Sequence, residues 1–268
     1  MHRLVPYLAV SAILAGFAMP QAHAQSGWNY GACVKMAKDS PETALKKAGD
    51  WVAAGGGFAA RHCVTLALVE LDRPAAAAKK LEALARDMAG TENAPPKARR
   101  AAILAQEGNA WLLADKPQKA YFALSEARSL LPEDDPAQAD ILLHRARAQA
   151  AMDNIKASRK DLDKAVKLAP KRADIRIFRA TALRRLDEID AALHDIEAAL
   201  ALAPDNPRAF LERGVLRYLS DDPIGAVQDW ERVLKLDAAE DVAAAARKHL
   251  KQVSSGADAT GDEKPQGQ

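Results

Sequence analysis

The sequence has few aromatic residues and almost no net charge. Aromatic residues make up 5% of its 268 residues, whereas apolar residues make up 49%. This combination suits α-helices that pack through small side chains. The formal net charge is +2, so no strong electrostatic field attracts nucleic acid or an anionic membrane surface. We expect no nucleic-acid partner.

The sequence also lacks the motifs of common catalytic and cofactor sites. The run Gly55-Gly56-Gly57 has no strand before it and no Lys-Ser or Lys-Thr pair after it, so it is not a phosphate-binding loop. Paired C-x-x-C motifs and the C-x-x-C-H haem signature are absent. Four histidines lie in separate predicted helices: His62, His144, His194 and His249. We therefore expect neither an enzyme nor a cofactor carrier.

The first 24 residues are typical of a secretory signal peptide. Arg3 provides the positive start, Leu4 to Phe17 is apolar, and Ala22-His23-Ala24 is a small-x-small cleavage site before Gln25. The alternative is an uncleaved membrane anchor, but the apolar run is shorter than the roughly 20 residues that a membrane-spanning helix needs. We expect export across the inner membrane, a periplasmic location and no stable membrane insertion after cleavage.

Residues 139–236 repeat with a period of 34. Small residues recur at two positions of each unit, a large apolar residue follows the second of them, and a leucine follows that. The members are Ala146, Ala180 and Gly214; Ser158, Ala192 and Ala226; Leu162, Ile196 and Trp230; and Leu168, Leu202 and Leu236. Pro170 and Pro204 end the first two units. Small residues let two helices approach closely, and proline ends the second helix of a unit.

This pattern resembles the tetratricopeptide repeat (TPR) superfamily. The unit 173–206 carries the family's small residues as Ala180, Ala192 and Ala199, and its proline as Pro204. It departs from the family at Arg176, where tryptophan is usual, and at Leu183, where tyrosine is usual. The resemblance implies an all-α, right-handed solenoid of antiparallel helix pairs, because one repeat alone cannot bury its apolar stripe. An ordinary helical bundle with accidental periodicity is the alternative.

After the predicted signal peptide, residues 1–24, the sequence divides into three further parts. Residues 28–89 hold two diverged helix pairs, and residues 98–253 form the regular array with a C-terminal capping helix. A further regular unit, residues 99–131, carries Gly108, Leu124 and Pro132 at the expected positions. Residues 254–268 are rich in Gly, Ser, Asp and Gln, so we expect a disordered tail after the array.

The two cysteines are Cys33 and Cys63. Both fall in predicted first helices of adjacent pairs, and such helices lie side by side in TPR proteins. An exported chain with an even number of cysteines favours a disulfide bond between them. The alternatives are two buried thiols, or a metal or haem site that uses Cys33, His62 and Cys63.

The resemblance also implies a binding groove along the first helices of the pairs. From the positions that line this groove in TPR proteins, we predict seven ligand-contacting residues: Asn109, Arg147, Ile177, Arg184, Arg185, Leu211 and Tyr218. Arginine pairs well with carboxylates, so an acidic or C-terminal peptide is the expected ligand. The predicted function is a non-catalytic periplasmic scaffold that binds a protein or peptide, with envelope assembly as its expected setting; a self-associating structural protein is the alternative.

Overall fold

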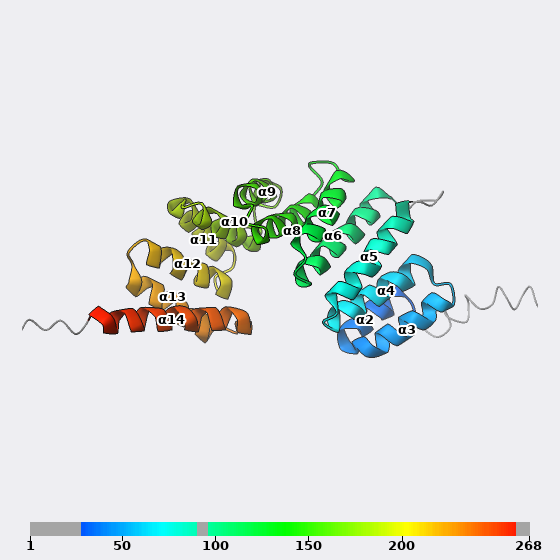
Figure 1. Cartoon of the computed structure of the whole chain (residues 1–268), viewed down its shortest axis with the longest axis horizontal. Helices are drawn as coiled ribbons and strands as arrows, with labels where there is room; N and C mark the ends of the chain where they lie inside the picture. Colours follow the sequence, from blue (N-terminus) through cyan, green and yellow to red (C-terminus); the bar gives the residue numbers. More distant parts are fainter. Residues whose placement is uncertain (1–27, 90–95, 261–268) are drawn as a thin grey trace, which may run out of the picture. The chain divides into compact units, whose positions relative to one another are not determined.

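The computed structural model describes residues 28–89 and 96–260, and every regular element in these ranges is an α-helix (Figure 1). The predicted signal peptide, residues 1–24, lies outside the described residues. The chain forms two units, residues 1–131 and residues 132–268, which we describe separately. None of the helices in the described ranges combines the length and the apolar character needed to span a bilayer.

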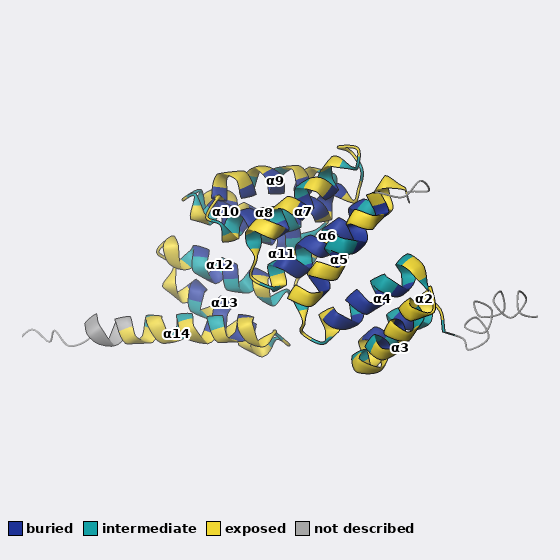
Figure 2. Ribbon diagram, turned by 45° about the vertical axis from the view of Figure 1, so that its right-hand side comes forward, coloured by how far each residue is buried: buried dark blue, intermediate teal, exposed yellow. Residues whose placement is uncertain are grey.

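The first unit contains three helix pairs. They are α2 (Tyr30–Asp39) with α3 (Pro41–Ala53), α4 (Gly57–Glu70) with α5 (Pro74–Ala89), and α6 (Lys97–Leu113) with α7 (Pro117–Ser129). Figure 2 shows buried residues in a stripe along one side of these helices and exposed residues on the other. Each helix therefore buries its apolar side against its neighbours in the unit.

The second unit contains three further pairs and one terminal helix. They are α8 (Gln138–Ala151) with α9 (Ile155–Leu168), α10 (Ala173–Arg185) with α11 (Ile189–Leu202), α12 (Pro207–Leu219) with α13 (Pro223–Lys235), and α14 (Glu240–Thr260). Val242 and Ala246 of α14 are buried against Trp230 of α13, while Arg247 and Lys248 are exposed. The predicted all-α fold of helix pairs with a capping helix is confirmed, and its right-handed twist stays a prediction.

The capping helix is longer than the sequence analysis expected. It continues past Val253 to Thr260, into the segment for which we expected disorder. The hydroxyl groups of Ser254 and Ser255 donate to the carbonyl oxygen of Lys251, at 3.0 and 2.8 Å, so these polar side chains bond within the helix. The rest of the predicted tail, residues 261–268, lies outside the described residues.

Five of the six turns within helix pairs of the described ranges use an aspartate in the left-handed backbone conformation. These residues are Asp72, Asp115, Asp153, Asp187 and Asp221, with φ between 52° and 64°. Aspartate tolerates this conformation better than most residues because its short side chain can bond locally. In the α6–α7 turn the Lys116 N–H then donates to the Trp111 carbonyl oxygen at 2.8 Å. The turn thus caps the first helix and starts the second one close to it.

The two helices of a pair cross where a small residue faces a large one, as the repeat pattern predicts. A Cβ atom added to Gly108 would lie 2.4 Å from Cγ of Leu124, and one added to Gly214 would lie 2.4 Å from Nε1 of Trp230. Real Cβ atoms do not approach other atoms so closely. The missing side chain on one helix therefore makes room for the large side chain on the other.

A buried ion pair joins the two helices of every pair in the second unit. The bonds run from Arg145 to Asp161 (2.6 and 2.7 Å), from Arg179 to Asp195 (2.5 and 2.6 Å), and from Arg213 to Asp229 (2.6 and 2.9 Å). The three aspartates are 1–4% exposed. In each case both carboxylate oxygens accept a bond from one guanidinium, which is the strong, directional form of this interaction. We call these three contacts the repeat ion pairs.

The cysteines of the first unit are joined as a disulfide bond between α2 and α4. Cys33 and Cys63 are both fully buried, and their Cα atoms are 6.0 Å apart. The bond connects the first helices of two adjacent pairs. It closes a loop of 30 residues, which on the chain-entropy model stabilises a fold by about 3–4 kcal/mol.

Removing one charge of a repeat ion pair should destabilise the second unit. Asp195→Asn removes the carboxylate that Arg179 and Arg176 share and leaves Arg179 with only its longer contact to Asp163 at 3.3 Å, so we expect a loss of about 3 kcal/mol in the free energy of unfolding. Glu197→Gln removes the same charge from an exposed position of α11 and should change stability by less than about 0.5 kcal/mol. Urea unfolding followed by circular dichroism measures both. Equal losses of unfolding free energy in the two variants would show that stability depends on the net charge and not on the ion pair.

Candidate functional site

The structure places the seven predicted ligand contacts in different environments. Asn109 lies half-buried on α6 of the first unit, and the other six belong to the second unit. Ile177 is only 8% exposed and packs in the core with Ala180 and Leu216. Leu211 is half-buried and packs against the cluster around Trp230. Ile177 is therefore a core residue, whereas part of the Leu211 side chain remains exposed; that these two residues contact a ligand stays a prediction.

Arg184 and Arg185 already have carboxylate partners within the second unit. Arg184 Nε donates to Glu212 at 2.6 Å, and Glu212 is 9% exposed. Arg185 donates to Asp153 at 2.7 Å and to the carbonyl oxygen of Ala150 at 3.1 Å. A ligand carboxylate would have to displace these partners. The two arginines thus offer much less positive charge to a partner than the sequence suggested.

Arg147 has no carboxylate partner in the described part of the chain. Its guanidinium lies 3.1 Å from Nδ1 of His144 and 5.5 Å above the centre of the Phe178 ring. Burial and the nearby charge of Arg208 both lower the pKa of Arg147, and burial lowers the pKa of His144. The half-buried positive charge of Arg147 would therefore be stabilised by an added carboxylate.

Tyr218 supplies an exposed aromatic side chain at the end of α12. It is 51% exposed, and its ring centre lies 6.1 Å from that of Trp230. Leu219 beside it is 56% exposed. Among the predicted contacts of the second unit, Arg147 thus has no carboxylate partner in the described residues and Tyr218 has an exposed aromatic ring.

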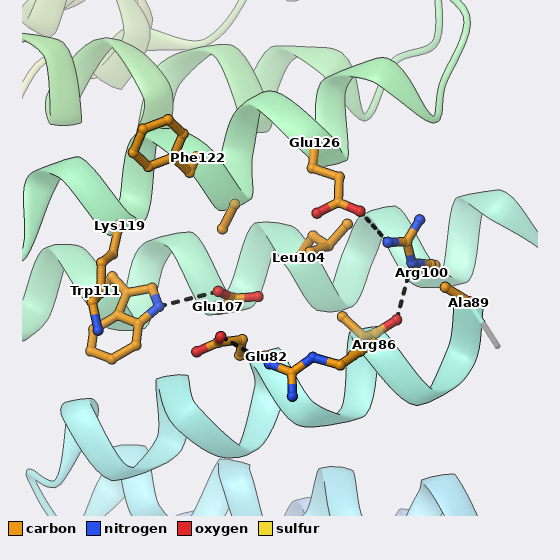
Figure 3. Close-up of a pocket in the computed structure, with 12 residues that line it drawn as sticks. Glu82, Arg86, Ala89, Arg100, Leu104, Glu107, Trp111, Lys119, Phe122 and Glu126 are labelled. Carbon is orange, nitrogen blue, oxygen red and sulfur yellow. Dashed lines mark hydrogen bonds and ion pairs between the residues drawn. The ribbon is translucent and has the colours of Figure 1, made fainter.

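The first unit contains a pocket of about 410 Å³ between α5, α6 and α7 (Figure 3). Its wall has charged and aromatic side chains from all three helices. The lining residues are Glu82, Ala85, Arg86, Ala89, Arg100, Leu104, Glu107, Trp111, Lys119, Phe122, Ala123 and Glu126. The repeat pattern marks Leu104 and Trp111 as helix residues of the unit 99–131 only by their position, and the sequence analysis did not predict this pocket.

Most charged groups of this pocket are already paired. Arg86 bonds to Glu82 at 3.0 Å, and Arg100 forms an ion pair with Glu126. The Lys119 ammonium lies 4.4 Å above the centre of the Trp111 ring. One carboxylate of the pocket wall takes part in no ion pair with a described residue, although the charge of Arg86 acts on it.

Glu107 is that carboxylate, and it is buried. It is 6% exposed, and its only hydrogen bond with a described residue comes from Nε1 of Trp111 to Oε1 at 3.1 Å. Burial raises the pKa of Glu107 to about 7, against the lowering effect of the bond from Trp111; the charges of Glu82 and Glu126 add to the rise, and the charge of Arg86 opposes it. Figure 3 shows its carboxylate in the middle of the pocket, between the Trp111 ring and the Glu82–Arg86 pair.

Both ring nitrogens of His62 lie at hydrogen-bond distance from polar side chains of other helices. Its Nε2 lies 2.6 Å from the Gln106 side-chain oxygen, and its Nδ1 lies 2.7 Å from the Tyr30 hydroxyl. The three residues line a second, mainly apolar pocket of about 370 Å³ in the first unit. Within the described ranges, no three His, Cys, Asp or Glu side chains are grouped in a way that could hold a metal ion.

Known structures share this fold. A tetratricopeptide repeat protein from Parabacteroides merdae ATCC 43184 matches over 90% of this chain and 92% of its own, with 13% identity and a TM-score of 0.62. TTC0263 of Thermus thermophilus, a thermophilic TPR protein, matches over 73% of this chain and 100% of its own, with 15% identity and a TM-score of 0.58. YrrB, a TPR protein with an unusual peptide-binding site, matches over 70% of this chain and 91% of its own, with 16% identity and a TM-score of 0.50.

These similarities define the class of fold, which is that of TPR proteins, as the repeat pattern predicted. At such low identity they establish the fold alone. A scan against protein-family models finds no match to the sequence, and a search of curated proteins finds none either.

Two features of the sites were visible in the sequence but not recognised. The repeat ion pairs keep the same 34-residue spacing as the small residues, directly before Ala146 and Leu162 and their equivalents. The α6–α7 pair has Glu107 and Ala123 at these two positions instead. Aligning the charged positions along with the apolar ones would have marked this pair as the exception.

The buried Glu107 should cost stability at neutral and higher pH. Its pKa lies near 7 in the folded state against an ordinary 4.5, so the folded state binds a proton that the unfolded state has lost between these values. Stability from this group is therefore highest at low pH and falls as the pH rises to about 7. Glu107→Gln, which keeps an oxygen for Trp111, should raise the free energy of unfolding by about 2 kcal/mol at high pH.

At pH values below about 4.5 the same variant should match the parent chain, because Glu107 is then protonated in both states. Urea unfolding at both extremes of pH measures the difference. Glu231→Gln on the exposed side of α13 is the control and should change the free energy of unfolding by less than about 0.5 kcal/mol. A Glu107→Gln variant that is less stable than the parent at high pH would contradict the assignment.

Proposed function

We propose that the protein is a non-catalytic scaffold whose second unit binds a peptide segment of a partner protein through a carboxylate. The observation that carries this proposal is Arg147, a half-buried arginine without a carboxylate partner among the described residues. A carboxylate from a side chain or from the C-terminus of a partner would give Arg147 an ion pair, as Glu212 gives Arg184 and Asp153 gives Arg185. The peptide-binding site named for YrrB supports the idea that this fold can serve such a role.

The exposed Tyr218 and Leu219 fit the same role. Peptide-binding surfaces combine one or two charged contacts with apolar and aromatic side chains that bury area on binding. Tyrosine can contact an apolar residue with its ring while its hydroxyl bonds to the peptide backbone. We infer that a peptide held by its carboxylate at Arg147 and by an apolar residue at Tyr218 is the class of ligand that this surface suits.

Loss of the Arg147 charge should weaken peptide binding selectively. The probes are fluorescein-labelled peptides with free C-termini, selected from a random library on the purified protein. Arg147→Gln should weaken their binding by about tenfold, which corresponds to one charge-assisted hydrogen bond. Arg185→Gln is the control, since its guanidinium is engaged by Asp153, and it should change the affinity by less than about twofold. Fluorescence anisotropy measures each affinity.

Two outcomes of this experiment would contradict the proposal. Arg185→Gln could weaken binding as much as Arg147→Gln, which would indicate a general effect of positive charge. Alternatively, peptides whose carboxylates are all amidated could bind as tightly as the free acids. Either result would mean that Arg147 does not receive a carboxylate.

We also propose that the protein is exported and acts in the cell envelope. The support comes from the signal-like residues 1–24 and from the joined Cys33 and Cys63, since disulfide bonds persist in oxidising compartments. The chain recovered from a periplasmic fraction should begin at Gln25, and its intact mass should rise by two hydrogen atoms on reduction. Recovery of the protein only from the cytoplasmic fraction would contradict export, and an unchanged mass on reduction would contradict the disulfide bond.

A further inference from the structure

The α6–α7 pair differs from the three pairs of the second unit at one pair of positions. In each pair of the second unit, an arginine on the first helix and an aspartate on the second helix form a repeat ion pair. The equivalent residues of the α6–α7 pair are Glu107, directly before Gly108, and Ala123, directly before Leu124. The α6–α7 pair therefore has a carboxylate in place of the guanidinium on its first helix, and a methyl group in place of the carboxylate on its second helix.

The pocket lies where the missing side chains would be. Glu107 and Ala123 both line it, and its volume of about 410 Å³ falls in the range typical of ligand sites, about 300–1,000 Å³. In the second unit the same place between the helices of a pair holds an arginine bonded to a carboxylate. The pocket thus presents the carboxylate of such an ion pair without its guanidinium.

The surroundings of Glu107 favour a cation over an anion. The two arginines of the wall are engaged by Glu82 and Glu126, so they offer little to an anion. An incoming anion would also lie beside the buried carboxylate of Glu107, which is repulsive. A planar cation could instead bond to the free Oε2 of Glu107 and lie against the ring of Phe122, which is 71% exposed.

We propose that this pocket binds the guanidinium group of an arginine side chain of a partner protein, with Glu107 as its carboxylate. The guanidinium would bond to Glu107 as Arg145, Arg179 and Arg213 bond to their aspartates in the second unit, but from outside the chain. This site lies in the first unit and needs neither Arg147 nor the peptide surface of the second unit.

Binding at this site should weaken as the pH falls through 7. Burial raises the pKa of Glu107 to about that value, and only the ionised carboxylate attracts a cation strongly. The other charged groups that line the pocket are Glu82 and Arg86 of α5, Arg100 of α6, and Lys119 and Glu126 of α7. Glu107 is the lining group whose titration controls binding near neutral pH.

The experiment uses N-acetyl-arginine amide as the probe and the whole purified protein. N-acetyl-citrulline amide is the matched control, because it has nearly the same shape without the charge. Nuclear magnetic resonance follows the indole N–H of Trp111, which donates to Glu107 and should shift on binding. We expect the arginine probe to shift this signal saturably at high pH and the citrulline probe to shift it at least about tenfold less.

Two variants test the role of Glu107. Glu107→Gln should bind the arginine probe at least about tenfold more weakly, whereas Glu42→Gln, the same change on α3, should bind as the parent does. The double variant Glu107→Arg with Ala123→Asp rebuilds the ion pair of the second unit inside the chain. This double variant should fold, its new arginine and aspartate side chains should fill the pocket, and the arginine probe should no longer shift the Trp111 signal.

Three results would overturn the proposal. The citrulline probe could shift the Trp111 signal as much as the arginine probe. Inorganic phosphate could shift it saturably while the arginine probe does not, which would make the pocket an anion site. The double variant could fold, as judged by circular dichroism, and still bind the arginine probe as the parent does. Any one of these would exclude Glu107 as the carboxylate for an incoming guanidinium.

Discussion

The close crossing of the two helices in each pair is the constraint on which the rest of the structure depends. At Gly108 and Gly214 even a methyl group would collide with the large residue of the partner helix. Because the helices lie so close there, a residue one position earlier on each helix also faces its partner across a short gap. In the second unit arginine and aspartate fill that gap. The ion pairs are thus a consequence of the crossing, and their buried charges are tolerable because each is fully paired.

The sequence predicted the helix pairs well because their determinants are local and repeated. Small residues, leucines, prolines and turn aspartates recur at fixed spacing, and each acts within its own pair. Arg176 shows how a departure can still fit the fold: it stands where TPR proteins usually have tryptophan, and it bonds to Asp195 at 3.2 Å and to the Pro170 carbonyl oxygen. The capping helix was underestimated at its C-terminal end, since Ser254 and Ser255 bond to the helix itself instead of ending it.

The ligand contacts stay a prediction, because position in a repeat does not reveal the partner of a charged side chain. Arg147, Arg184 and Arg185 looked equivalent in the sequence. Only the folded chain shows that Glu212 and Asp153, which are distant in the sequence, have engaged two of them. For the same reason the number of arginines on a repeat surface is a poor guide to its charge. The useful quantity is the number of buried or half-buried charges that remain without a partner, and those become visible only with the side chains in place.

Arg147 and Glu107 are opposite cases of one physical situation. Each is a charged group, half-buried or buried, that forms no ion pair with a described residue. In each case burial moves the pKa toward the value that favours the neutral form. A fold optimised only for stability would replace Glu107 by an apolar or amide side chain, or would place Asp at position 123 and Arg at position 107 as its own repeats do elsewhere. Retaining an unpaired carboxylate in a pocket costs folding free energy at neutral pH. That cost is recovered only when a cation from outside the chain occupies the pocket, so a partner that carries one would stabilise this unit in proportion to its affinity.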